Sequence, residues 1–594
     1  RGPDGEGIWI HPGVGLGHRR LAIIELTDLG AQPMRTKDGK YTITYNGEVY
    51  NYKSLRAELE QKGSVFYSES DTEVVLEAYR HFGPDCTARL RGMFAFAIWD
   101  EERQSCFIAR DRIGKKPLYY RTLSDGTIAF ASELNPLRAL ESVSVDRCAI
   151  RLFIGLQYVP APKTGFKEIS CLPAGHRGWI RNGEVRVEAY ETWERHPSQE
   201  MLDVSQDLLQ LLSESVRIRL QADVSVGAFL SGGIDSAACV AIAQQYMDRP
   251  IHTFTMGFPY IKMDERHEAR ETANYFNTDH HEFEAKPESL LAMTEQLIEQ
   301  YGGPYADSSA LPVMLLAREV AKEIKVVLVG DGGDELFGGY RRYRAFCRAL
   351  ALASIPGSRL LGASMLKRIG KFMHDPRFTR MSETVKATAG DANAGYAELF
   401  TGSYFSSKYA PKYFDPAFMQ GERGCDPVSF IRTRMGSAGH PMQRALYFDL
   451  TSYLADDLNV KMDRATMTYG LEARAPFLDQ ELMSYVLRLP LNRRMNCDKP
   501  KMALKQALKG LVPTEIMNRK KRGFQVPLAE WFRGSLKQHW MDRCLDPSSP
   551  LRAYIQPEKV KVLFEENVRG VDHGNRLWML WALAAWLERV NSNA

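Results

Sequence analysis

Cysteine is scarce in this sequence of 594 residues, which contains nine of them and no CxxC pair. Structural zinc sites and small disulfide-bonded domains need cysteines at close and regular spacing, so neither is expected. We interpret the nine cysteines as free thiols of a reducing compartment, which predicts a cytoplasmic protein. Long apolar runs are also missing. The longest, residues 577–587, is about half as long as a membrane span and predicts a buried helix.

Charge of one sign is not in excess, because 77 Lys and Arg face 73 Asp and Glu, a net charge of +4. We therefore expect neither nucleic acid nor an acidic membrane as a partner. The sequence starts at Arg1 without Met, and no basic segment followed by an apolar one marks a secretory signal. We expect that residues preceding Arg1 are missing. The length and an apolar content of 44% predict two or three folded domains.

The first part of the chain, residues 1–190, alternates short β-rich segments with turn signals. Strands are predicted at residues 41–45, 93–99 and 128–131. The dipeptide Asn46-Gly47 after the first strand is expected to form a corner. One helix is predicted over residues 71–82, where Asp71 precedes several apolar positions and a Gly-Pro dipeptide follows. The pattern predicts a layered, largely antiparallel domain with few helices.

A different pattern begins at about residue 203, where apolar strands alternate with helices. Strands are predicted at residues 224–230, 251–257 and 325–330, with a helix after the first. Strands separated by helices predict an α/β fold with a doubly wound parallel sheet. We therefore expect domains at residues 1–190 and 203–594, with the boundary near residues 191–198. The last part is predicted to be helical, and the basic stretch 341–371 is interpreted as solvated surface.

The hexapeptide Ser-Gly-Gly-Ile-Asp-Ser at residues 231–236 lies between a predicted strand and a predicted helix. Its glycines let the backbone approach an oxyanion, and the helix N-terminus supplies free N–H groups, so a pyrophosphate site is predicted. The loop lacks the Lys of a Walker motif, and γ-phosphate transfer is not expected. Asp235 is predicted to bind Mg²⁺ through its carboxylate. The alternative is a tight strand-to-helix turn that holds no ligand.

A second strand end carries the carboxylates of Asp331, Asp334 and Glu335. Ligands of open parallel sheets bind beyond the carboxyl ends of strands, and three close carboxylates need a cation or a proton. We expect a metal here, with a capped Asp-Gly turn as the alternative. A lysine that faces such a site could stabilise leaving pyrophosphate. Further charged positions admit both a functional role and a place on the solvated surface: Asp463, Arg464, Lys501 and residues 519–524.

Taken together, these motifs resemble the glutamine-hydrolysing asparagine synthetases. The C-terminal segments that carry the resemblance are residues 231–236, 330–335, 461–464, 471–479 and 522–524. The N-terminal segments, which are similar to a class II glutamine amidotransferase domain, are residues 1–4, 18–21, 46–51 and 70–73. The resemblance spans nearly the whole chain in matching order. It implies an N-terminal αββα domain like the Ntn hydrolases and a C-terminal ATP-pyrophosphatase domain with a helical end.

The resemblance implies a glutamine site in the N-terminal domain. Arg20 is expected to bind the glutamine α-carboxylate, because its guanidinium fork matches a carboxylate, and Asp71 is expected to bind the α-amino group. Asn46 and the N–H of Gly47 are implied as the oxyanion hole, which needs preorganised donors. The full implied set is Arg20, Ile23, Asn46, Gly47, Glu48 and Asp71.

The resemblance also implies a site for ATP and Mg²⁺. The ATP-binding residues that it implies are Leu230, Ser231, Gly232, Gly233, Asp235, Ser236, Met256, Val329 and Gly330. Mg²⁺ is assigned to Asp235 and Asp334, while Lys501 over the phosphates and Asp331 are implied as catalytic. A carboxylate, most simply that of L-aspartate, would attack the α-phosphorus, and ammonia would then displace AMP. A homodimer is left open beside a monomer.

Three departures from the family pattern leave alternatives open. The family's N-terminal nucleophilic cysteine would precede Arg1, and the first cysteine here is Cys86, so we expect residues 1–594 alone not to hydrolyse glutamine. Asp331 replaces a glutamate, and residues 305–312 lack an arginine that some members use for aspartate. The acceptor could therefore be aspartate, or a uronic-acid sugar or another carboxylate of surface polysaccharide synthesis. Amide closure as in β-lactam synthetases and a non-enzymatic role are the remaining alternatives.

Overall fold

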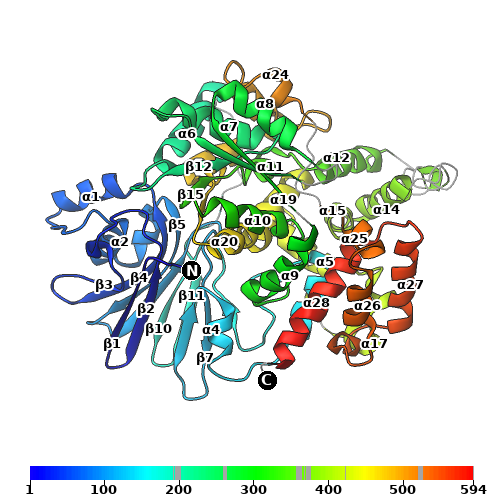
Figure 1. Cartoon of the computed structure of the whole chain (residues 1–594), viewed down its shortest axis with the longest axis horizontal. Helices are drawn as coiled ribbons and strands as arrows, with labels where there is room; N and C mark the ends of the chain where they lie inside the picture. The colour runs from blue at the N-terminus through cyan, green and yellow to red at the C-terminus, as the bar shows by residue number, and fades with distance from the viewer. Residues whose placement is uncertain are drawn as a thin grey trace.

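The structure is a computed structural model that describes residues 1–191, 193, 203–257, 264–285, 287–355, 364–366, 368, 376–421, 423–519 and 526–592. In Figure 1 the N-terminal β-rich part lies at the left, the parallel sheet at the top and the C-terminal helices at the right. Most of the predicted boundary at residues 191–198 lies outside the described residues. The same holds for the motif at residues 522–524 and for much of the stretch 341–371.

The N-terminal part is built on antiparallel sheets, as predicted. A six-stranded sheet has the order β11-β10-β6-β5-β4-β3, a three-stranded sheet has the order β8-β7-β9, and β1 pairs with β2. The strands are β1 (Gly5–His11), β2 (Val14–Arg20), β3 (Met34–Arg35), β4 (Tyr41–Val49), β5 (Gly92–Asp100), β6 (Ser105–Arg110), β7 (Tyr119–Thr122), β8 (Ile128–Ala131), β9 (Ser170–Cys171), β10 (His176–Arg181) and β11 (Glu184–Ala189). The helices are α1 (Tyr52–Gln61), α2 (Asp71–Phe82), α3 (Cys86–Arg89), α4 (Leu134–Arg138) and α5 (Arg147–Leu156).

Helix α2 confirms the predicted helix at both ends. The Ser70 hydroxyl accepts a hydrogen bond from Thr72 N and caps the first turn, and Gly83 ends the helix with φ +56°. The corner predicted at Asn46-Gly47 is wrong, because β4 continues through both residues to Val49. Each pairs with β5, Asn46 opposite Ala95 and Gly47 opposite Phe94, so the dipeptide lies within a strand.

The second part is built on a parallel sheet, again as predicted. Its strand order is β14-β13-β12-β15-β16, and every neighbouring pair is parallel. In Figure 1, α7 and α8 lie above the sheet and α10 and α20 below it. The strands are β12 (Val226–Phe229), β13 (His252–Gly257), β14 (Asp279–Glu284), β15 (Val326–Leu328) and β16 (Glu472–Arg474). The helices before residue 340 are α6 (Val204–Arg219), α7 (Ile234–Ala243), α8 (Arg266–Phe276), α9 (Pro287–Tyr301), α10 (Ala310–Val320) and α11 (Gly333–Phe337).

The remainder of the chain is helical. Its larger helices are α12 (Arg341–Ala353), α14 (Pro376–Gly390), α15 (Ala392–Thr401), α18 (Pro427–Met435), α19 (Pro441–Phe448), the π-helix η6 (Asp449–Leu458), α20 (Asn459–Met467), α21 (Gln480–Arg488), α23 (Met502–Ala507), α25 (Leu528–Arg533), α26 (Lys537–Leu545), α27 (Pro557–Val568) and α28 (Gly574–Ser592). The apolar run 577–587 is buried within α28, as predicted, and Trp578 Nε1 donates to Ala306 O at 3.0 Å. Among the described helices, none combines the length and the apolar character of a membrane span.

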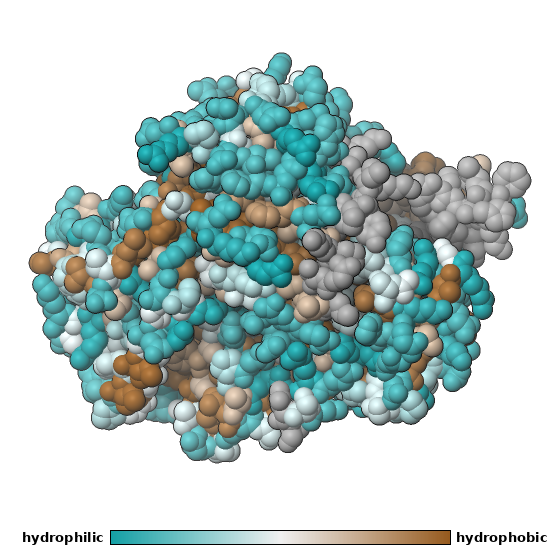
Figure 2. All heavy atoms as spheres, in the orientation of Figure 1, coloured by the Kyte–Doolittle hydropathy of each residue, from teal (hydrophilic) through white to brown (hydrophobic). Residues whose placement is uncertain are grey.

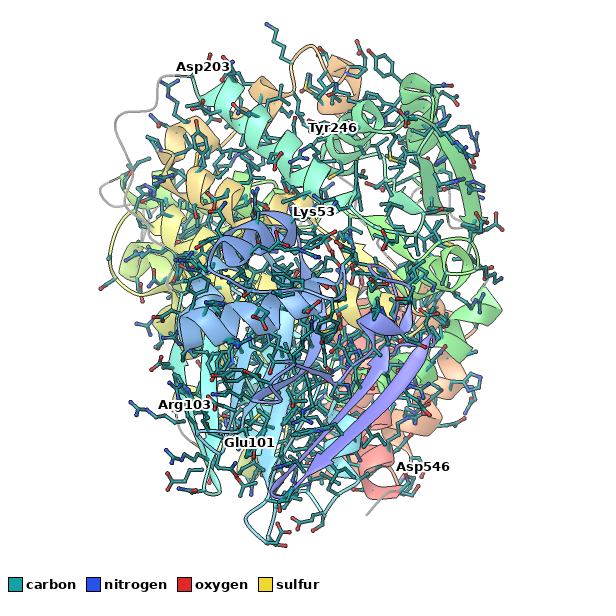
Figure 3. All side chains as sticks on the ribbon, turned by 90° about the vertical axis from the view of Figure 1, so that its left-hand side faces the viewer. Lys53, Glu101, Arg103, Asp203, Tyr246 and Asp546 are labelled. Carbon is teal, nitrogen blue, oxygen red and sulfur yellow. A yellow bond between two sulfur atoms is a disulfide. The ribbon has the colours of Figure 1, made fainter. Side chains whose placement is uncertain are left out.

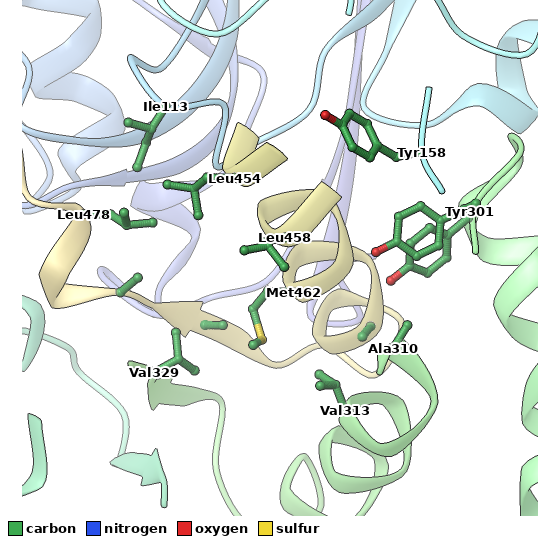
Figure 4. Close-up of a cluster of buried hydrophobic side chains, with 14 of the residues drawn as sticks. Ile113, Tyr158, Tyr301, Ala310, Val313, Val329, Leu454, Leu458, Met462 and Leu478 are labelled. Carbon is green, nitrogen blue, oxygen red and sulfur yellow. The ribbon is translucent and has the colours of Figure 1, made fainter. Parts of the chain in front are cut away.

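The two parts share a core. Figure 4 shows apolar side chains from both sides of their junction, with Ile113 and Tyr158 from the N-terminal part and Leu458 and Val329 from the second part. Figure 3 shows that the two parts follow one another along the molecule. Glu101, in the turn after β5, lies near the lower end, and Asp203 before α6 lies at the opposite end.

Four of the nine cysteines form disulfides, so the expectation of nine free thiols is wrong. The pairs are Cys148–Cys425 and Cys347–Cys497, which are 277 and 150 residues apart in the sequence. Disulfides between cysteines so far apart cannot be predicted from cysteine spacing in the sequence, because only the fold brings the partners together. The other five cysteines are free and buried, and they alone fit the expected reducing compartment.

Candidate functional site

The first of two large cavities lies in the N-terminal part and has a volume of about 840 Å³. All six residues predicted to bind glutamine line it: Arg20, Ile23, Asn46, Gly47, Glu48 and Asp71. They come from β2, the segment after it, β4 and the start of α2, so the fold brings together positions that are 51 residues apart. Ile8 and Ile10 on β1 are exposed at 79% and 80%, and Ile8 also lines the cavity. Figure 2 shows apolar surface at the lower left, where β1 and β2 lie.

Asp71 is fixed in the wall of this cavity by β4. Its Oδ2 accepts hydrogen bonds from Tyr45 Oη at 2.7 Å and from Val49 N at 3.0 Å. Burial raises the pKa of Asp71 to about 6, although both hydrogen bonds favour its ionised form. The carboxylate is therefore ionised at neutral pH and can bind a cationic group.

Arg20 is held by backbone carbonyls. Its guanidinium donates to Thr27 O at 2.8 Å and also to Glu25 O. A Cβ at Gly30 would lie 2.1 Å from Arg20 Nη2, so glycine at this position leaves the space that the side chain occupies. Burial lowers the pKa of Arg20. A guanidinium fixed in this way presents a preorganised cation to the cavity.

Glu48 faces the second part of the chain. It is buried, and its Oε2 lies 3.2 Å from the guanidinium of Arg474 on β16. Arg474 also donates to Glu472 Oε1 at 2.9 Å, and Glu472 lines the same cavity. Burial raises the pKa of Glu48 well above its ordinary value, although Arg474 opposes the shift. Glu48 is thus a structural link as well as a lining residue, which the sequence did not indicate.

Cysteine is absent from the described residues that line this cavity. The five free cysteines, Cys86 among them, are buried elsewhere in the described chain. The described lining thus holds donors and charges suited to glutamine, and no thiol nucleophile.

The second cavity, of about 870 Å³, lies beyond the carboxyl ends of β12 and β15. Eight of the nine predicted ATP residues line it: Leu230, Ser231, Gly232, Gly233, Asp235, Ser236, Val329 and Gly330. Met256 does not. It is buried on β13, and Phe254, two residues earlier, lines the cavity instead. Lys505 and Arg519 also line it, the latter held by Glu268 O at 2.6 Å, so the start of the basic run is not simply a solvated loop.

The loop after β12 is organised by its own serines. Ser236 Oγ accepts from Ser231 N at 3.2 Å, and the two hydroxyls lie 3.0 Å apart. Helix α7 begins directly after Gly233, whose φ and ψ are extended. The free N–H groups of the first turn of α7 therefore face the cavity next to two hydroxyls, which is an arrangement suited to phosphate oxygens.

Three charged groups meet at the ends of β12 and β15. Lys501 Nζ lies 2.6 Å from Asp334 Oδ1 and also contacts Asp235 Oδ2. The lysine backbone has φ +57° and donates its N–H to Phe337 O at 3.0 Å, which directs the side chain inward. A Cβ at Gly339 would lie 1.9 Å from Asp334 Oδ1 and 2.3 Å from Lys501 Cε. Only glycine fits beside this cluster.

The two aspartates fit a magnesium site. Asp235 Oδ1 is buried and has no hydrogen-bond partner among the described residues, and a Cβ at Gly333 would lie 2.4 Å from it. Space is therefore kept beside an unused carboxylate oxygen, and Mg²⁺ prefers such ligands. Glu335 does not belong to this set, because it is buried away from the cavity and accepts a hydrogen bond from Tyr340 Oη at 2.5 Å. Burial raises the pKa of Glu335 to about 7.

One side of this cavity is basic, which the sequence pattern did not predict. Arg341 and Arg344 on α12 line it, so the start of the stretch interpreted as solvated surface faces the site. Lys461 also lines it, with Nζ 3.1 Å from both Asp307 Oδ2 and Ser309 Oγ. Burial opposes protonation of Lys461, yet the neighbouring carboxylates, Asp307 first, raise its pKa. Only the folded chain shows that these cations meet, because more than 100 residues separate α12 from Lys461.

Asp463 and Arg464 are buried rather than surface charges. Asp463 pairs with Lys116 at 3.4 Å and with Arg1, and Arg464 pairs with Glu133 at 3.2 Å. Both side chains therefore join the two parts of the molecule, and neither lines the second cavity.

Both halves of the chain match families of known proteins. The family described as "Asparagine synthase" matches residues 207–588, and the family described as "Glutamine amidotransferase domain" matches residues 1–191. A Bacillus subtilis protein named asparagine synthetase (glutamine-hydrolyzing) 1 is 32% identical over 99% of this chain and 91% of its own. A putative asparagine synthetase (glutamine-hydrolyzing) of Mycobacterium tuberculosis is 33% identical, with the same coverage. Amidase chry2 of Gibberella zeae is 29% identical over 90% of this chain and 84% of its own.

Proposed function

The chain belongs to the family of glutamine-hydrolysing asparagine synthetases, a family of ligases, and on that premise we propose that it amidates L-aspartate to L-asparagine. ATP would be cleaved to AMP and pyrophosphate in the second cavity. The observation that supports this most directly is the position of Lys501 between Asp235 and Asp334, beyond the ends of neighbouring parallel strands.

We assign glutamine to the first cavity. Asp71, ionised at neutral pH, would bind the α-ammonium group, and the guanidinium of Arg20 would bind the α-carboxylate. Asn46 and the N–H of Gly47 would stabilise the oxyanion that forms when the side-chain amide is attacked. Asn46 Nδ2 lies 3.4 Å from Ser132 Oγ, a weak contact that leaves the amide free to turn toward a ligand.

We assign ATP to the second cavity, with its phosphates at the residues 231–236 loop and the N-terminus of α7. The acceptor carboxylate would attack the α-phosphorus, the bond to the β-phosphate oxygen would break, and pyrophosphate would leave. Lys501 would stabilise the negative charge that grows on pyrophosphate. Mg²⁺ held by Asp235 and Asp334 would neutralise phosphate oxygens in the same region. Ammonia would then attack the acyl carbon and release AMP.

The acceptor is assigned to the basic side of the cavity, near Ser309, Lys461 and the two arginines of α12. Two or more cations suit a dicarboxylate such as aspartate. A second candidate is a carboxylate on a larger molecule, such as a uronic-acid sugar. The departures at Asp331 and residues 305–312 favour it, and a relative named as an amidase has similar coverage. A cytoplasmic location is also part of the proposal.

The proposal is tested by pyrophosphate release from Mg·ATP with ammonium chloride as the nitrogen donor, so that glutamine hydrolysis is not required. Purified chain is assayed with L-aspartate, with D-glucuronate and without acceptor, and products are identified by mass spectrometry. We expect aspartate-dependent pyrophosphate together with AMP and asparagine. Release that depends on glucuronate alone would favour the second candidate. If Mg·ATP binds and neither acceptor stimulates release, the aspartate proposal is wrong.

A further inference from the structure

A cluster of two histidines and one aspartate lies at the amino ends of β13 and β14, on the edge of the parallel sheet. His252 is the first residue of β13 and pairs in register with Asp279, the first residue of β14. His281 pairs with Phe254, two residues further along both strands. Because side chains alternate between the faces of a sheet, His252, Asp279 and His281 share one face.

The ligand atoms of this cluster converge. His252 Nδ1 lies 2.9 Å from Asp279 Oδ2, and His281 Nε2 lies 3.4 Å from Asp279 Oδ1. One ligand atom from each of the three residues falls within 4.8 Å of the other two. A tetrahedral metal with bonds of about 2.0–2.1 Å places its ligands roughly 3.3 Å apart, and the two spacings to Asp279 are close to that value.

The two nitrogens have no other role in the described structure. The side chains of His252 and His281 are 42% and 33% exposed, but the two nitrogens themselves are shielded from solvent. Neither makes a hydrogen bond within the described residues. The rings are also fixed, because the His281 ring stacks on Phe254 with centroids 5.2 Å apart. Two shielded imidazole nitrogens beside one carboxylate form a set of ligands that a divalent transition metal can bind.

The ligand set selects the kind of metal. Two imidazole nitrogens and one carboxylate suit Zn²⁺ and other divalent transition metals, whereas Mg²⁺ and Ca²⁺ prefer oxygen ligands alone. The site also differs from the one at Asp235 and Asp334 in position, because it lies at the amino ends of the strands and the nucleotide cavity lies at the carboxyl ends. The two sites therefore differ in both chemistry and place.

We propose that His252, Asp279 and His281 bind one Zn²⁺ or a similar divalent transition metal, with water as the fourth ligand. The metal joins edge strand β14 to β13 and stabilises the edge of the sheet. It also fixes Phe254, whose ring lines the nucleotide cavity. The proposal does not depend on the acceptor or on the proposed activity.

The test uses Zn²⁺ itself as the probe on the full chain, after removal of bound metal with a chelator. Isothermal titration should give one strong site, and thermal unfolding should shift to higher temperature with Zn²⁺. His252→Ala and His281→Ala should weaken binding at least tenfold and lose the thermal shift. His280→Ala is the matched control. It lies on the same strand but on the other face, where His280 Nδ1 contacts Thr253 Oγ1 at 2.9 Å, and it should bind like the native chain.

Co²⁺ in place of Zn²⁺ gives a second readout, since its visible spectrum reports nitrogen and oxygen ligands and would reveal any thiolate. Far-ultraviolet circular dichroism and Mg·ATP binding show that each variant is folded. If a variant does not fold, Asp279→Asn replaces it, because it keeps the side-chain shape. Equal Zn²⁺ affinity in the native chain and in the folded His252→Ala and His281→Ala variants would overturn the proposal. An equal loss in His280→Ala would also overturn it.

Discussion

Asp71 shows how one buried residue can make binding depend on pH. Its pKa of about 6 lies above the unfolded value of about 3.9, so the folded chain holds this proton more tightly. Ionisation of Asp71 therefore lowers the free energy of unfolding as pH rises from about 4 to 6, and the loss is complete above pH 6. The ionised form, obtained at that cost, is the one that attracts an ammonium group.

We predict that glutamine affinity falls as pH decreases through 6, because protonated Asp71 cannot pair with the α-ammonium group. Below the pKa, the loss of affinity should approach about tenfold for each pH unit. Burial lowers the pKa of His18 to about 4, so this neighbour stays neutral over that range. Calorimetric titration with glutamine between pH 7 and pH 5 measures the effect. Asp71→Asn should bind weakly at every pH. Constant native affinity over this range would contradict the role given to Asp71.

Asp235→Asn should lower the rate of pyrophosphate release about 100-fold or more while the fold is kept. The substitution removes one negative charge from the proposed Mg²⁺ site, and such charges supply several kcal/mol of transition-state stabilisation. Pyrophosphate release with saturating acceptor and ammonium measures the loss, and thermal unfolding checks the fold. An unchanged rate would show that Asp235 does not serve the metal.

Lys501→Ala should slow adenylate formation far more than it weakens binding of Mg·ATP. The negative charge that the ammonium group meets is greatest in the transition state, so the variant loses stabilisation there first. Single-turnover kinetics give the rate of adenylation, and calorimetry gives the dissociation constant of Mg·ATP. Equal losses in both quantities would identify Lys501 as an ordinary binding contact. Lys505→Ala is a control on the same cavity, since this lysine contacts Asn518 rather than the two aspartates.

At the scale of elements, the position of Lys501 depends on the short helix α11 and the two glycines after it. Asp334 lies in α11, Lys501 N donates to Phe337 O in the same helix, and Gly339 follows with no room for a Cβ. The helix and the lysine-bearing segment therefore form one unit, although more than 160 residues separate them. A change in the packing of this unit should move the charge of Lys501 without removing it.

Gly339→Ala tests that unit. A methyl group would overlap Asp334 Oδ1 and Lys501 Cε, so we expect a rate of pyrophosphate release at least tenfold lower, with the native charges all present. Gly424→Ala is the matched control, because no atom lies within 4 Å of a Cβ at that position. Native activity in Gly339→Ala would mean that Lys501 or Asp334 moves aside without cost.

Some elements of the fold could be predicted from the local sequence. Helix α2 and β5 follow from capping and apolar patterns, and the loop at residues 231–236 follows from glycines between a strand and a helix. The turn predicted at Asn46-Gly47 was wrong, because pairing with β5 outweighs the turn preference of the dipeptide.

Other features had no local signal at all. Arg341 and Arg344 line the cavity, and Cys347 pairs with Cys497. Both features depend on contacts between segments that are distant in the sequence. The position of Met256 outside the cavity lining depends on where β13 stops facing it, which alternation alone does not reveal. The family resemblance identified the candidate glutamine-binding and ATP-binding residues. Only the fold shows which of them line a cavity.

At the scale of the whole molecule, Arg474 connects the two cavities. Its guanidinium lies between Glu48 and Glu472 and also donates to Gln221 O at 2.7 Å. Its own carbonyl accepts the N–H of Val329 at 2.8 Å, and Val329 lines the second cavity. One fully buried residue therefore contacts the lining of both cavities.

We predict that Arg474→Met lowers the free energy of unfolding by about 3–5 kcal/mol, because it removes the cation that pairs with two buried carboxyl groups and the donor of two carbonyl groups. Thermal unfolding should show the loss, and calorimetry should show weaker binding of both glutamine and Mg·ATP. Glu48→Gln added to Arg474→Met should recover part of the stability, since it replaces a buried carboxyl group that has lost its cation.

Arg91→Met is the control for this prediction. Arg91 also joins the two parts of the molecule, through Asp479 at 2.8 Å, but Asp479 keeps Arg219 at 3.0 Å when Arg91 is lost. Its substitution should therefore cost less and leave both affinities close to native. If Arg474→Met and Arg91→Met had equal effects on stability and on the two affinities, Arg474 would be one interdomain ion pair among several. Only a loss at both cavities that is specific to Arg474 supports its role as their connection.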